Sequence, residues 1–186
     1  MAVQVTAVPT SLVWSNYTQT DNQPTDDDGN NVDAFTRFSF DIPVIRTHWV
    51  TQKVGFDRSK TGKLVSFDMN GAYTIRITPS GLKVWKKIQQ TADLLSHEQL
   101  HYDIGVIAAQ ELIKDLAALQ APTMAELGKA FNAVVDLHFK TRSKAVNVQY
   151  DAETKHGADA QKQKVWKDAM TACLNGTSTT IIGLPF

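Results

Sequence analysis

The stretch 94–116 constrains the fold most, because its apolar and histidine positions repeat at the spacing of one helical face. Steps of three and four residues separate Leu94, His97, His101, Ile104, Ala108, Leu112 and Leu116, a pattern typical of an amphipathic helix. No proline interrupts residues 80–119, and Pro122 follows them. Because one helix over all these residues would be unusually long, we expect a break between Gly81 and Thr91.

This helix carries the motif His97-Glu98-Gln99-Leu100-His101. Two histidines four residues apart point the same way from a helix, and the intervening Glu98 can reach a water on a metal that both hold. Zinc needs neutral imidazoles at short, fixed distances and keeps one position open in catalytic sites. The motif predicts the zinc site of a peptidase, and its alternative is two packed histidines beside a solvated glutamate.

A catalytic zinc needs a third protein ligand, and few residues qualify. Glu111 lies ten residues beyond His101, about 15 Å along the helix axis, and is too far away. His138 occupies a core-facing position of the next helix and is interpreted as a packed histidine, with a ligand role as the alternative. His48 lies on an expected strand and is a weaker candidate ligand. His156 is favoured, because a helix ends directly after it and polar residues precede it.

The residues before His156 suggest supporting roles. Tyr150 is a candidate donor to the oxyanion of the transition state, and a purely structural tyrosine is the alternative. Asp151, Glu153 or Asp103 could orient the ligand imidazoles, and the spacing does not choose among them. The expected mechanism is hydrolysis of a peptide bond with Glu98 as the general base.

The first half of the chain predicts strands. Alternating apolar residues favour a strand over 34–42, β-prone residues fill 44–56, and Asn70-Gly71 between alternating stretches predicts a hairpin. We expect an antiparallel sheet that packs against the long helix. An exposed edge strand beside a peptidase site could hold an extended peptide by backbone pairing, whereas a purely structural sheet is the alternative.

Two further helices are expected after Pro122. Thr123 and Glu126 form a capping box, and the helix that follows presents an apolar face of Met124, Leu127, Phe131, Val134, His138 and Ala145. A last helix is expected from about Ala158 to Asn175-Gly176, with Val165, Trp166, Ala169 and Cys173 inward. The prediction is one α+β, zincin-like domain over 1–186, mainly β over 1–79 and mainly α over 80–176, with a tail over 177–186.

Composition excludes several classes of partner. Nineteen basic and nineteen acidic residues cancel, so no overall field favours nucleic acid. No apolar run approaches the length of a membrane span, and the first residues lack an export signal.

One cysteine cannot form an internal disulfide. The acidic loop Asp26-Asp27-Asp28 misses the spacing of a calcium loop and is interpreted as solvated.

Two motifs together resemble a known family. His97-Glu98-Gln99-Leu100-His101-Tyr102-Asp103-Ile104 and the later Tyr150-Asp151-Ala152-Glu153-Thr154-Lys155-His156-Gly157, followed by Gln161 and Trp166, resemble bacterial proteins described as predicted secreted zinc-dependent proteases. The resemblance implies that His97, His101 and His156 bind zinc and that Glu98 is the base. It also implies export, although this chain shows no signal segment.

A binding module in which zinc only ties the two motifs together is a second hypothesis. Structural zinc sites close all four positions with protein ligands and favour cysteine, whereas histidine is the ligand available here. The ligand types therefore favour catalysis. A metal-free interaction protein with a decayed site is a third hypothesis.

Overall fold

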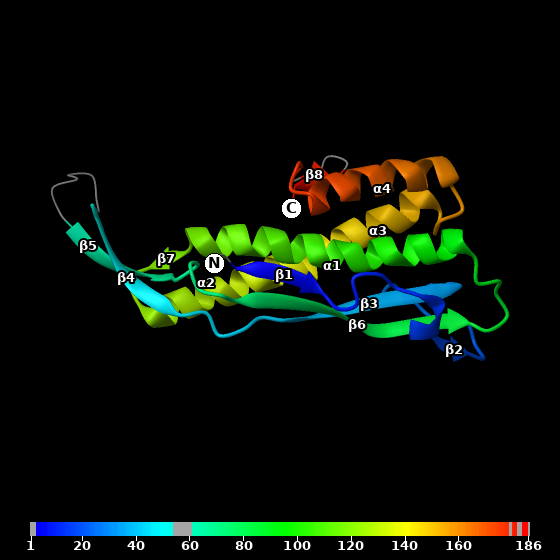
Figure 1. Cartoon of the computed structure of the whole chain (residues 1–186), viewed down its shortest axis with the longest axis horizontal. Coiled ribbons are helices and arrows are strands. Elements are labelled where there is room, and N and C mark those ends of the chain that lie inside the picture. Colours follow the sequence, from blue (N-terminus) through cyan, green and yellow to red (C-terminus); the bar gives the residue numbers. More distant parts are fainter. Residues whose placement is uncertain (1–2, 54–60, 179, 182–183, 186) are drawn as a thin grey trace.

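A long helix, α1 (Ala92–Ala118), lies between a β-sheet and a layer of shorter helices (Figure 1). This computed structural model describes residues 3–53, 61–178, 180–181 and 184–185. Strands fill the first part of the chain and helices most of the rest, so the expected α+β class is confirmed.

The main sheet is built around β6 (Thr74–Trp85). β1 (Gln4–Ala7) and β2 (Thr18–Thr20) pair with it in parallel, and β3 (Ala34–Asp41) pairs with it antiparallel along the other edge. The sheet is therefore mixed, and the expectation of a purely antiparallel sheet was wrong. Among the described strands, β3 pairs only with β6, which leaves its far edge without a strand.

The hairpin expected at Asn70-Gly71 does not form. β5 (Thr61–Phe67) pairs with β4 (Thr47–Lys53) and with β7 (Gln120–Ala121), so it belongs to a second sheet. Asn70-Gly71 instead joins the two sheets, because both edges of β6 already pair with other strands.

The change from strand to helix also falls later than expected. β6 runs through Pro79, which lies opposite Phe38 where the register of β3 shifts. A bulge tolerates proline because the missing N–H removes no regular ladder bond there. The helix begins only at Ala92, where Thr91 Oγ1 accepts a hydrogen bond from Leu94 N.

The helices after α1 include one continuous helical stretch. α2 (Met124–Asp136) starts at the expected cap Thr123 and passes through the π-helical segment η2 (Leu137–Arg142) into α3 (Ser143–Thr154). α4 (Ala160–Leu174) follows, capped by Asp159. The short elements are η1 (Trp14–Asn16), β8 (Thr180–Ile181) and β9 (Leu184–Pro185). Among the described helices, none is both long and apolar enough to cross a membrane.

The predicted inward face of α1 is confirmed, and Ile104, Ala108, Leu112 and Leu116 are fully buried. Tyr102 locks the helix onto the sheet, because its hydroxyl donates to the Ile77 carbonyl oxygen at 2.7 Å and accepts from Val8 N at 3.1 Å. Three residues expected to face inward are exposed: Met124, Ala145 and Val165. For Ala145 the reason is η2, whose wider turn changes the phase of the helix.

We predict that Gly105→Ala destabilises the fold through a clash between α1 and β3. A Cβ at this position would lie 2.6–2.8 Å from ring atoms of Phe38, so the ring or the helix must move. We expect the free energy of unfolding in urea to fall by about 1–3 kcal/mol.

The matched control is Gly128→Ala on α2, where a Cβ meets nothing within 4 Å. This exposed helical position should gain about 0.5–1 kcal/mol. Equal stabilisation by both substitutions would contradict the packing described for Phe38.

Candidate metal centre

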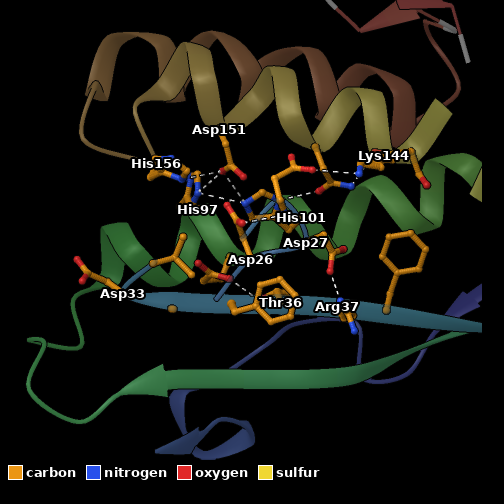
Figure 2. A pocket seen from close by; sticks show the side chains of 18 of the residues that line it. Asp26, Asp27, Asp33, Thr36, Arg37, His97, His101, Lys144, Asp151 and His156 are labelled. Carbon is orange, nitrogen blue, oxygen red and sulfur yellow. Dashed lines mark hydrogen bonds and ion pairs between the residues drawn. The ribbon is translucent and has the colours of Figure 1, made fainter. Parts of the chain in front are cut away.

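Three side chains from two helices converge on one point beside the sheet (Figure 2). His97 and His101 come from α1, and their Nε2 atoms lie 3.2 Å apart. Asp151 reaches them from α3, with Oδ1 3.1 Å from Nε2 of His97 and 3.0 Å from Nε2 of His101. His97 is 3% exposed and the His101 side chain 11%, so the cluster is largely shielded from water.

Amide side chains fix the orientation of both imidazoles. Nδ1 of His101 lies 2.6 Å from Oδ1 of Asn147, whose Nδ2 donates to the Ser143 carbonyl oxygen at 2.7 Å. Nδ1 of His97 lies 3.2 Å from Oε1 of Gln163. Because an amide oxygen only accepts, each Nδ1 carries the hydrogen. In the neutral imidazoles the Nε2 lone pairs therefore face Asp151, where each Nε2 can bind either a proton or a metal ion.

The donor set fits a divalent metal ion. Two imidazole lone pairs and a carboxylate oxygen are all acceptors, so either a proton or a metal ion can bridge them. In a tetrahedral zinc site with bonds of about 2.0–2.1 Å, neighbouring donor atoms lie about 3.3 Å apart. The observed separations of 3.0–3.2 Å are close to that value.

Without a metal ion, the negative charge of Asp151 favours a proton on His101. Burial lowers the pKa of His101. The hydrogen bond to Asp151 and the negative charge of Asp151 raise it by more than burial lowers it, so the pKa is about 9. Burial raises the pKa of Asp151, but hydrogen bonds from His101 and His97 hold it well below its usual range. A metal ion would therefore compete with a proton for the same lone pairs.

His156, the residue expected as the third ligand, lies beside this cluster. Its Nδ1 is 3.6 Å from Oδ1 of Asp151, and its side chain is 51% exposed. Lys155 and His156 have φ values of 51° and 52°, followed by Gly157 at 84°. A side chain at residue 157 would approach the His97 ring to 3.1 Å, so this left-handed turn packs tightly against a candidate ligand.

Tyr150 lies behind His97, away from the cavity. Its ring stacks on the imidazole at 4.6 Å between centroids, and the tyrosine is fully buried. Its hydroxyl bonds to Gln163 and donates to the His97 carbonyl oxygen. These contacts hold His97 in position.

Glu98 opens onto a cavity of about 370 Å³ that also contains the three clustered side chains. The cavity lies between α1, β3 and the helical stretch from η2 to α3. Oε2 of Glu98 accepts a hydrogen bond from Thr36 Oγ1 at 2.5 Å, and Thr36 in turn lies 2.8 Å from the Tyr17 hydroxyl. A strand residue thus fixes one oxygen of the carboxylate.

The acidic loop forms another wall of this cavity. Asp27 pairs with Arg37 of β3 and Asp28 with Lys144 of α3. The third carboxylate, of Asp26, accepts hydrogen bonds from two backbone N–H groups and the Asn30 amide, which together lower its pKa despite partial burial. The loop interpreted as merely solvated therefore spans the space between strand and helix.

The other candidate ligands lie outside the cluster. His138 is fully buried, with Nε2 2.7 Å from Asp115 Oδ2, and His48 belongs to the second sheet. Glu111 pairs with Lys114. Within the described residues, the group able to hold a metal consists of His97, His101 and Asp151.

Sequence reasoning missed part of this site. The sequence predicts for Asp151 only an orienting role, although its Oδ1 contacts both imidazoles directly. Asn147 and Gln163 were not singled out. The available signal was helical spacing, since Asn147 precedes Asp151 by one turn and shares its face.

A family model described as a bacterial protein of unknown function (DUF922) matches residues 10–157. This range includes both motifs and ends directly after His156. The comparison with curated proteins gave no match, and neither did the comparison with solved structures.

We predict that Zn²⁺ binds to the purified protein and that Asp151→Ala weakens this binding at least about a hundredfold, because one donor atom is lost. His156→Ala should change the affinity less, since its ring lies outside the three-atom cluster. Competition with a chromophoric zinc chelator measures both variants.

Asp168→Ala is the control, because this exposed carboxylate pairs with Lys164 on α4, away from the cluster. If His156→Ala abolishes binding and Asp151→Ala does not, the third ligand is His156, as the sequence predicts.

Proposed function

The chain belongs to the DUF922 family of bacterial proteins of unknown function, and from this premise we propose that it is a zinc-dependent peptidase with a zincin-like arrangement. Its substrates would be proteins or peptides. The α+β fold supports the proposal, because one long helix lies along a sheet beside a cavity.

One observation carries the proposal. Nε2 of His97 and Nε2 of His101 converge with a carboxylate oxygen of Asp151, while Glu98 of the same helix lines the same cavity. A purely structural pair of histidines would need neither the convergent carboxylate nor a cavity next to Glu98.

In this proposal His97, His101 and Asp151 hold the ion, and His156 stands beside Asp151 at the cavity. When bound, zinc would supply Lewis acidity, which polarises a substrate carbonyl and makes water more acidic near neutral pH. Three protein donors are the number that catalytic zinc sites use, since a fourth position must stay open.

Glu98 would act as the general base. It would accept a proton from the attacking water as the water oxygen bonds to the carbonyl carbon, and return it to the nitrogen as the C–N bond breaks. Thr36 holds Oε2, so Oε1 is the oxygen available to the water.

The remaining residues would act through the histidines. Gln163 and Asn147 keep both Nε2 lone pairs directed at the cluster, which is the usual task of partners behind metal ligands. Tyr150 packs against His97. We therefore assign Tyr150 a positioning role in place of the oxyanion contact expected from its sequence position.

We predict that Glu98→Gln retains stoichiometric zinc and loses peptide hydrolysis by about a hundredfold or more, because the amide cannot take a proton. Zinc content is measured by elemental analysis, and turnover by release of new amino termini from an unfolded protein. Glu126→Gln, at an exposed position on α2, is the control and should keep full activity.

Retained hydrolysis in Glu98→Gln would remove the assigned base. Stoichiometric zinc with higher thermal stability but no hydrolysis by the wild type would instead support the zinc-stabilised binding module.

A further inference from the structure

The cavity has an aromatic end that the proposed chemistry does not use. Phe38 and Phe40 of β3 and Phe139 of η2 line it together. The rings of Phe40 and Phe139 stack with centroids 3.9 Å apart, and Phe38 is tilted over Phe139 at 6.2 Å. Phe40 is 38% exposed, so an apolar surface faces the cavity and is only partly covered.

Phe139 of η2 extends the side of α3 that lines this cavity. Asp151, Asn147 and Ser143 follow one face of α3 at steps of four residues, and all three line the cavity. Phe139 lies four residues before Ser143 and continues this series into η2, and the Ser143 Oγ donates to the Phe139 carbonyl oxygen at 2.7 Å. The helical wall thus runs from the carboxylate of the cluster to the aromatic rings.

The cations around this end of the cavity have partners within the protein. Arg37 pairs with Asp27, Lys144 with Asp28, and Lys140 with Asp136 one turn earlier on the helix. The positive charges of these three side chains are thus already matched by neighbouring carboxylates. The aromatic rings are therefore the recognition surface that this end offers.

Strand geometry gives the distance between the end of the cavity at Glu98 and its aromatic end. Thr36 contacts Glu98, and Phe40 lies four residues farther along β3, which is about 13 Å at the rise of a strand. Along this length the far edge of β3 has no partner among the described strands. An extended polypeptide beside β3 advances at the same rise per residue.

On the premise of the proposed peptidase function, we infer that the substrate is an extended polypeptide with an apolar side chain, about four residues from the bond that is cut, packed on Phe40 and Phe139. The substrate backbone lies along β3, and the apolar side chain selects the cleavage site. The loop that carries Asp27 and Asp28 encloses the chain, and its two exposed ion pairs are weak enough to open.

The test compares synthetic peptides that differ only in one residue, phenylalanine or serine, placed at successive distances from a fixed cleavable bond. Mass spectrometry gives the cleavage rate of each peptide. We expect phenylalanine to raise kcat/KM about tenfold at one position, three to five residues to one side of the bond. Phe40→Ser should remove this preference, and Phe40→Leu should keep most of it.

Trp49→Ser is the matched control, because Trp49 is another exposed aromatic residue, 58% accessible, and lies on β4 in the other sheet. It should leave the preference unchanged. Circular dichroism and thermal unfolding establish that each variant folds. Binding of the same peptides, labelled with a fluorophore, to zinc-supplemented Glu98→Gln protein measures recognition without turnover.

Two results separate this inference from the proposed function. Hydrolysis with no preference at any of these positions would overturn the inference and leave the peptidase intact. Phenylalanine-dependent binding that Phe40→Ser abolishes, in a wild type that cleaves nothing, would support the aromatic subsite and overturn the peptidase. Binding and cleavage that are both absent would overturn both.

Discussion

The contact between Asp151 and the two imidazoles of α1 is the interaction on which the rest of the site depends. It joins α1 to α3 at the wall of the cavity, where Oδ1 of Asp151 lies 3.0 Å from Nε2 of His101 and 3.1 Å from Nε2 of His97. The sheet supports it from the other side, since Tyr102 and Thr36 hold α1 against β6 and β3. β3, α1 and α3 thereby place two imidazoles and the carboxylates of Glu98 and Asp151 around one cavity.

The sequence predicted those parts of the fold that depend on local signals. Helical periodicity identified the buried face of α1, and the side chains of Thr123 and Asp159 cap helices close to where they were expected. Asn70-Gly71 was misleading because a turn signal says nothing about which strands pair. Pro79 was also misleading, because the bulge opposite Phe38 that accommodates it depends on a distant strand.

In the site, too, the sequence predicted the residues fixed by local structure and missed those that depend on contacts between distant elements. His97, Glu98 and His101 could be identified because one helix fixes their mutual geometry. Asp151, Asn147 and Gln163 could not, since their place depends on how α3 and α4 rotate against α1. The π-helical segment adds a phase shift that the apolar pattern did not predict, and both Phe139 and Lys140 of this segment line the cavity.

The cluster joins residues 54 positions apart in the chain, which has a consequence for how the protein persists in a cell. An ion held there would act as a reversible cross-link that only the native chain can form, so its binding energy would add to folding by mass action. The amount of intact protein would then follow the local supply of free metal. A shortage of metal would then lower the amount of folded protein, whether or not the protein has catalytic activity.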